Sequence, residues 1–176
     1  MPGQQVIFAA AGPDRPGVMD EISQFVHERG GSIADSRSIN LRGQFALLVL
    51  IGGSGEAIER LRKDLEALAS RVGFSARIEP ADGSQRSVDT FPYHFIARGT
   101  DRAKAIQRVS HLFRVLNINI ESLETKVQPA PRDGGAAPFE MKLGLAVPRE
   151  TPIVMLREYL TQLCQETDIT FDLTAA

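Results

Sequence analysis

The residues best placed to do chemistry lie in one short segment, Gly12-Pro-Asp-Arg-Pro-Gly17, which follows an apolar run and precedes a helical pattern. A helix that begins near Pro16 leaves its first backbone N–H groups without intrahelical partners, and such groups attract a carboxylate. Gly17 has no Cβ, so a small molecule can approach the backbone closely. The same residues also make a good turn and helix start, with Asp14 as the helix cap. The segment therefore has two interpretations, a site for a small carboxylate or a turn alone.

Polar side chains nearby would complete such a site. Asp14 and Asp35 carry carboxylates that can accept hydrogen bonds from an α-ammonium group, and Asn40 or Ser36 can orient it. We expect a free amino acid, held where loop 12–17 meets the second strand or across an interface between domains or subunits. The expected ligand-binding residues are Gly12, Asp14, Arg15, Gly17, Val18, Asp35, Ser36 and Asn40.

Other motifs lack residues that their chemistry needs. Gly52-Gly-Ser-Gly55 lies between a strand and a helix, but no lysine follows at P-loop spacing, and Ser54 is better explained as a helix cap. The three histidines have no partner at metal-ligand spacing, and Cys164 is the single cysteine, which argues against a metal site or an intrachain disulfide. No nucleophile elbow, triad or pair of carboxylates is evident. We therefore expect no catalytic residues, no metal, no cofactor and no enzymatic activity.

Composition narrows the class of partner. Of 176 residues, 43% are hydrophobic and 24% charged, with a net charge of −2 and no tryptophan. The chain has no excess of basic residues to bind phosphates and few aromatic residues to stack on bases. Direct sequence-specific binding of nucleic acid is therefore not expected. No apolar run approaches the roughly 20 residues that span a bilayer, and the first residues do not resemble a signal peptide. A cytoplasmic protein without a membrane contact is expected.

The elements that must position the site occur twice. Gly12-Pro-Asp-Arg15 recurs as Gly99-Thr-Asp-Arg102, and in the same register Ile33 falls on Ile120. In each half, apolar periodicity predicts the order strand, helix, strand, strand, helix, strand. The expected strands are 6–11, 32–41, 44–51 and 74–79 in the first half, and 93–98, 119–127, 139–147 and 169–173 in the second. The expected helices run from 16 to 30, from 55 to 72, from 103 to 116, and from a cap at Thr151-Pro152.

This order predicts an α+β protein built from two ferredoxin-like units. In each, right-handed crossovers place both helices on one face of a four-stranded antiparallel sheet. The expected first domain is 1–80, the second is 91–176, and the polar segment 81–90 is the linker. The other face of each sheet must be covered, and an exposed edge strand can pair with another chain, so a homo-oligomer is expected.

Two of these motifs carry a family resemblance. Loop 12–17 together with Gly30-Gly-Ser-Ile-Ala-Asp-Ser36 resembles the ACT domain, a regulatory module that binds amino acids. The tandem layout over essentially the whole chain resembles the glycine cleavage system transcriptional repressor family. The second copy, Gly99-Thr-Asp-Arg-Ala-Lys104, keeps Asp101 and Arg102 but lacks the Pro-Gly pair. The resemblance to a ligand loop is therefore weaker in the second half.

The resemblance implies a noncatalytic regulator. Such a protein senses a small amino acid, with glycine or serine as the natural candidates, and represses transcription by contacting a partner transcription factor. The alternative is a regulatory subunit that senses a small molecule and controls a metabolic enzyme. The identity of the protein that this chain binds would discriminate between the two.

Overall fold

The chain forms two compact units, residues 1–85 and 86–176. The structure is a computed structural model that describes residues 3–81, 89–132 and 134–176. Each unit has a hydrophobic core of its own. Most of the predicted linker, 81–90, falls on residues 82–88 and so lies outside the described residues.

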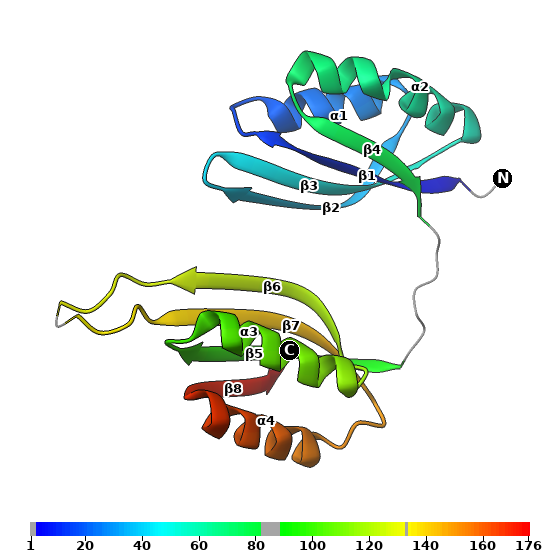
Figure 1. Cartoon of the computed structure of the whole chain (residues 1–176). Helices are drawn as coiled ribbons and strands as arrows, with labels where there is room; N and C mark the ends of the chain where they lie inside the picture. Colours follow the sequence, from blue (N-terminus) through cyan, green and yellow to red (C-terminus); the bar gives the residue numbers. More distant parts are fainter. Residues whose placement is uncertain (1–2, 82–88, 133) are drawn as a thin grey trace. The chain divides into compact units, whose positions relative to one another are not determined.

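The first unit has the predicted order of elements (Figure 1). Its sheet has the strand order β2-β3-β1-β4, with every neighbouring pair antiparallel. A two-residue turn, Arg42-Gly43, joins β2 to β3 with positive φ at both positions, as a tight hairpin requires. The elements are β1 (Gln4–Pro13), α1 (Val18–Glu28), β2 (Ser32–Leu41), β3 (Gln44–Gly53), α2 (Gly55–Val72) and β4 (Ser75–Pro80).

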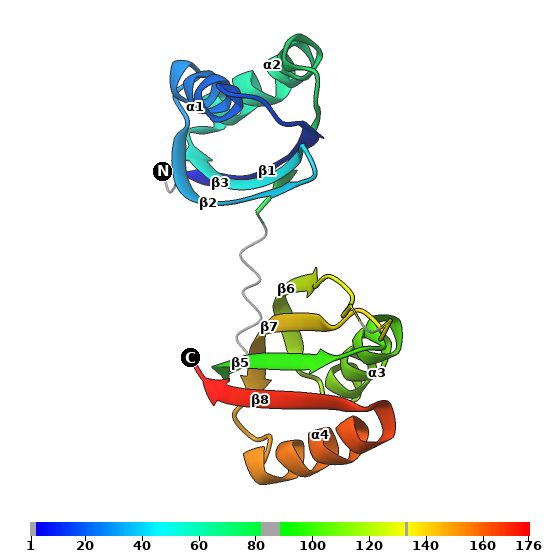
Figure 2. The same cartoon turned by 90° about the vertical axis from the view of Figure 1, so that its left-hand side faces the viewer.

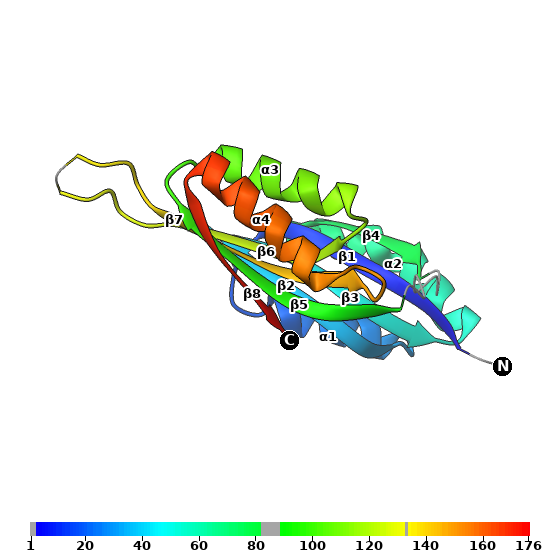
Figure 3. The ribbon, with the colours of Figure 1, turned by 90° about the horizontal axis from the view of Figure 1, so that it is seen from below.

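The second unit repeats this topology, with the strand order β6-β7-β5-β8 and antiparallel pairing throughout. Figure 3 shows α3 and α4 side by side over their sheet, and the longer connection between β6 and β7 extending beyond it. The elements are β5 (Thr90–Gly99), α3 (Arg102–Val115), β6 (Asn119–Val127), β7 (Phe139–Pro148), α4 (Ile153–Thr167) and β8 (Ile169–Ala175).

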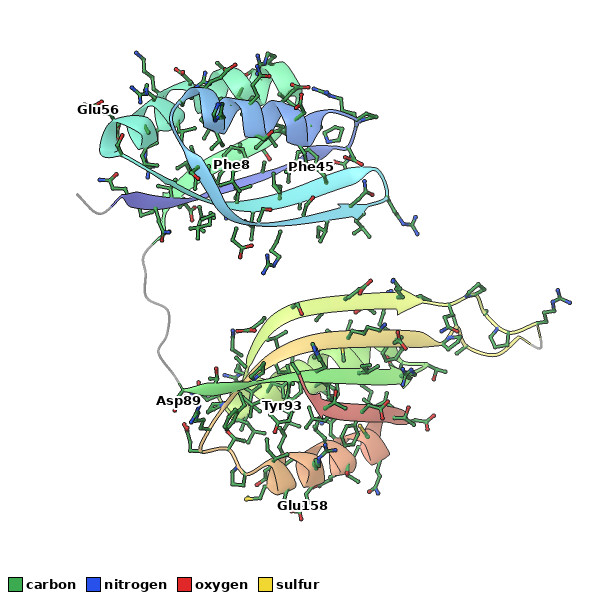
Figure 4. All side chains as sticks on the ribbon, turned by 180° about the vertical axis from the view of Figure 1, so that it is seen from behind. Phe8, Phe45, Glu56, Asp89, Tyr93 and Glu158 are labelled. Atoms are coloured by element: carbon green, nitrogen blue, oxygen red, sulfur yellow. The ribbon has the colours of Figure 1, made fainter. Side chains whose placement is uncertain are left out.

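Each unit has two layers, with both helices on one face of the sheet (Figure 2). The core lies between the layers, because alternate residues of the central strands and one stripe of each helix are apolar. Phe8 and Phe45 point into the first core (Figure 4), and each meets the Phe74 ring edge to face. Phe95, the counterpart of Phe8 in the repeat, meets Phe113 in the same way. The predicted ferredoxin-like architecture is confirmed in both halves.

The helix ends follow local chemistry, and the structure corrects two of the expectations about them. Ser54 caps α2 as predicted, since its hydroxyl accepts a hydrogen bond from Ala57 N at 3.2 Å. The prediction that α1 begins near Pro16 is wrong, because Gly17 has a φ of +94° and the helix starts only at Val18. At α4 the expected cap at Thr151-Pro152 has the right position but makes no side-chain hydrogen bond, because Pro152 is the cap residue.

The repeat extends to irregular features of the backbone. In one edge strand of each sheet an extra residue forms a β-bulge, between Ile33 and Asp35 in β2 and at the corresponding place in β6. Gly12 is held by packing, since a Cβ there would lie 2.7 Å from Phe74 Cβ. A Cβ on Gly99 would lie 2.6 Å from Ile169 Cγ2, at the equivalent junction of the second unit. The two units are therefore matched residue by residue where the first strand meets the fourth.

Candidate functional site

The loop between β1 and α1 is tied to the tip of the β2–β3 hairpin. Asp14 N donates a hydrogen bond to Gly43 O at 2.8 Å, and Asn40 Nδ2 donates to the Asp14 carboxylate. Both Asp14 and Asn40 are exposed. The structure thus brings together two of the polar residues that the sequence analysis proposed. Asp14 binds Asn40 and does not cap the helix, so the capping role predicted for it is wrong.

The N-terminus of α1 is open. Its cap residue is Gly17, which has no side chain to accept a hydrogen bond from the helix. The Val18 N–H lies 3.4 Å from Arg15 O, and Glu21 N donates to Gly17 O at 3.0 Å. Within the described ranges, neither a side-chain cap nor a loop carbonyl accepts from Met19 N or Asp20 N. These N–H groups, together with the helix dipole, can receive an anion.

An ion pair flanks this opening. Arg15 Nη1 lies 2.7 Å from Glu21 Oε1, and the two groups are the nearest neighbours of the space where a Gly17 side chain would project. The hydrogen bond from Arg15 lowers the pKa of Glu21, and the hydrogen bond to Glu21 raises the pKa of Arg15. Sequence reasoning missed Glu21, because nothing in its spacing from Arg15 indicates that the loop turns back onto the first helical turn.

In the second unit, a side chain of the chain itself caps the corresponding helix N-terminus. Asp101, the counterpart of Asp14, caps α3 by accepting a hydrogen bond from Lys104 N at 3.1 Å. Without a Pro-Gly pair, α3 begins at Arg102, three residues earlier in the repeat than α1. The same residue type therefore has two roles: Asp101 closes one helix N-terminus, while Asp14 leaves the other open.

Two predicted site residues, Asp35 and Ser36, lie far from the loop along β2. Asn40 is opposite Phe45, next to Gly12, whereas Asp35 is opposite Leu50 in the other half of β2. At about 3.4 Å per residue, Asp35 and Ser36 are roughly 14–17 Å along the strand from Asn40. Asp35 accepts hydrogen bonds from Ser36 N and Arg37, and these lower the pKa of its carboxyl group.

The remaining two predicted residues lie at the loop but offer only their backbone. Val18 is 4% exposed and its side chain belongs to the core. Gly12 lies against Phe74, so its lack of a side chain is explained by packing between β1 and the start of β4. The loop cluster therefore consists of the side chains of Asp14, Arg15, Glu21 and Asn40 around the backbone at Gly17.

The first unit matches a known domain family. The ACT domain family model matches residues 4–79. The glycine cleavage system transcriptional repressors of Escherichia coli (strain K12) and Shigella flexneri are each 24% identical to this chain over 161 residues, which is 92% of this chain and 84% of theirs. No helix within the described ranges combines the length and the hydropathy needed to cross a membrane.

Solved structures share the whole tandem fold. A protein of unknown function from Galdieria sulphuraria is 26% identical, with a TM-score of 0.80 over 99% of both chains. A protein provisionally named a glycine cleavage system transcriptional repressor is 23% identical, with a TM-score of 0.72 over 98% of this chain and 96% of that one. The first unit thus matches the ACT domain, the second repeats its fold, and the chain as a whole resembles the glycine cleavage system transcriptional repressors.

Proposed function

We propose that this chain is a noncatalytic cytoplasmic regulator that senses a small amino acid with its first ACT domain. In this proposal it acts as a transcriptional regulator by contacting a partner transcription factor, without reading DNA itself. Glycine and serine are the proposed ligands, because both are small amino acids and the resemblance is to repressors of glycine cleavage. The names of the relatives, glycine cleavage system transcriptional repressors, support the regulatory role.

The open N-terminus of α1 is the observation that carries the proposal. The ligand carboxylate binds the free N–H groups after Gly17 and replaces Glu21 on the Arg15 guanidinium, because both groups offer positive charge at the helix start. The ligand ammonium group binds the exposed Asp14 carboxylate, which Asn40 orients. Asp35 and Ser36 reach such a ligand only from a second copy, since they are too far along β2 of the same chain.

Regulation requires that the ligand favours one state of the protein over another. A ligand that binds both states equally shifts nothing, however tightly it binds. In the proposed mechanism the bound amino acid fixes loop 12–17 against the hairpin tip at Gly43, and the partner binds only one of the two loop states. The second unit, whose helix is already capped by Asp101, contributes a binding surface for the partner and no amino-acid site.

A panel of the twenty amino acids tests the sensing step. At about one hundred times the dissociation constant, a true ligand stabilises the first unit by roughly 2.7 kcal/mol. This raises the Tm of a domain of that size by about 10 °C or more. Differential scanning calorimetry measures the shift, and glycine or serine is expected to produce it. A flat panel would contradict amino-acid sensing.

Gly17→Val locates the site. Its φ of +94° strains any other residue, and a valine also covers the approach to the backbone. The variant is expected to stay folded, to lose the ligand-induced rise in Tm and to lose ligand-dependent capture of the partner from native cells. Gly30 lies at the opposite end of α1 and has a φ of +78°, so Gly30→Val introduces a similar backbone strain. This variant should keep the ligand-induced rise in Tm and the ligand-dependent capture of the partner. Normal sensing in Gly17→Val would place the ligand elsewhere, and capture of a metabolic enzyme would favour the alternative regulatory role.

A further inference from the structure

The helix-free face of the first sheet is apolar at its centre. Along this face, which we call the open face, a groove of about 430 Å³ has Ala9, Ala11 and Ala46 as its floor. Ile39 and Leu48 stand beside it and are 65% and 52% exposed. In Figure 4, side chains project from this side of the sheet as well as from the side that the helices cover. An apolar sheet face of this kind is typical of a surface that another layer covers.

Charges border the apolar centre in an ordered way. One row across the four strands reads Arg37, Leu48, Ala9 and Arg77, with an arginine at each edge. The next row on the same face has an acid at each edge, and each arginine contacts the acid of its own strand: Arg37 Nη1 lies 2.6 Å from Asp35, and Arg77 Nε lies 2.9 Å from Glu79. All four charged side chains are more than half exposed. The open face therefore presents a basic row and an acidic row with the same spacing.

The second unit differs at the corresponding positions. Lys142 replaces Leu48, and Arg98 replaces Ala11 in the repeat. Arg98 pairs with Glu140 at 2.8 Å and with Asp172 at 3.1 Å, and Lys142 also pairs with Glu140. These ion pairs suit a surface in water. Among the described residues of the two sheets, only the first sheet therefore has a helix-free face with an apolar centre.

We propose that the open face of the first sheet binds the same face of a second copy of this chain in a two-fold pair. The basic row and the acidic row determine the direction of the two-fold axis. A two-fold axis along the strands would stack β2 on β4 and place arginine on arginine. A two-fold axis across the strands, between the two rows, stacks Arg37 on the second copy's Asp35 and Arg77 on its Glu79. Opposite charges then meet in four contacts, two at each edge of the pair, and such complementarity fixes register in an interface.

The apolar centre fits the same arrangement. The middle of the acidic row is formed by Leu50 and Ile7, which are opposite each other in β3 and β1. The axis between the rows places Leu48 on the second copy's Leu50, and the small Ala9 on its larger Ile7. Large and small side chains alternate in this way when two sheets pack about 10 Å apart. This proposal rests on the homo-oligomer that we expect, and it does not depend on amino-acid sensing.

Substitutions on the open face test the pair in the full chain. Sedimentation equilibrium at about 100 µM, which saturates a micromolar dimer, is expected to give twice the mass of one chain. Leu48→Glu buries a charge at the centre and should raise the dimer Kd by about 100-fold or more. Arg77→Glu places like charges together and should raise the Kd by about tenfold, and Arg77→Glu with Glu79→Arg should restore it. Lys142→Ala, the matched change on the second sheet, should leave the mass unchanged.

Three results would overturn the proposal: a monomer at this concentration, a dimer that survives Leu48→Glu, or a double charge swap that behaves like Arg77→Glu. A dimer that survives Leu48→Glu would point to pairing through the β2 edge instead. Circular dichroism verifies that each variant is folded. The amino-acid shift in Tm is measured on the same samples, so loss of the dimer with sensing retained separates the two proposals.

Discussion

Phe8→Ala is expected to unfold the first unit at a temperature at which the second stays folded. Phe8 is fully buried between the sheet and the helices, and its ring packs against Phe74. Replacement of such a residue by alanine costs about 3–5 kcal/mol. For a domain of this size the loss lowers Tm by more than about 12 °C. Calorimetry should resolve an early transition, and hydrogen exchange should show lost protection confined to residues 3–81.

The repeat supplies the reciprocal variant. Phe95 is equally buried in the second core, so Phe95→Ala should destabilise residues 90–175 and spare the first unit. Phe91→Ala is the control, because that ring is 46% exposed and packs mainly under Arg149. Its expected cost is about 1 kcal/mol or less. If either buried variant lowered both transitions equally, the two cores would be one cooperative unit.

Cys164 is expected to be about 100-fold less reactive in the native chain than in the unfolded one. Burial against the stripe of Leu156 and Leu160 on α4 raises the pKa of its thiol to about 11. The thiolate is the reactive form, and a shift of two pH units reduces its fraction at pH 8 by about two orders of magnitude. Ellman's reagent reads this residue alone, since the chain has one cysteine.

The sign of the pH effect follows from the direction of the shift. The folded chain holds the thiol proton more tightly than the unfolded chain, so stability from this group is complete below pH 9 and is lost as the pH rises toward 11. Unfolding in guanidinium chloride at pH 8 should restore fast labelling. Fast native labelling at pH 8, with the second transition intact, would contradict a buried thiol.

The strands and their order follow from apolar spacing. The predicted bounds 32–41 and 119–127 are those of β2 and β6, and the alternation from Phe139 to Val147 gives β7 to within one residue. β7 was predictable because one face of the strand is buried and its residues alternate. β2 and β6 are almost entirely exposed, and their bounds were predictable from the turn and loop residues beside them. The hairpin at Arg42-Gly43 was predictable because Gly43 accepts the positive φ that a tight turn requires, although Arg42 has a positive φ as well.

The start of α1 was harder to predict, for a local reason. A proline favours the first turn of a helix, which placed the expected start near Pro16. The left-handed backbone of Gly17 follows that proline and delays the helix until Val18. Composition alone cannot choose between these outcomes, since both residues are common where helices begin.

The arrangement of the site residues depended on features that the sequence does not display. The predicted strand 32–41 already implied that Asp35 and Asn40, five residues apart, face opposite sides of the sheet. β2 has no apolar alternation, so the sequence did not indicate which of those sides the helices cover. The open face was hidden for the opposite reason, because the apolar runs of β1 and β3 are continuous and do not say which side lacks helices. Only the pairing of strands placed Arg37 and Arg77 in one row.

The bulges at matched places in β2 and β6 also bear on the behaviour of this chain at high concentration. An outer strand of ten regular residues would offer a continuous ladder to a neighbouring molecule, and β2 of one chain joined to β4 of the next would grow without limit. The extra residue, Ala34 in β2, breaks that ladder between Ile33 and Asp35 and twists the strand locally. In each half, the bulge therefore shortens the regular part of the β2 or β6 edge to which a neighbouring molecule could add a strand.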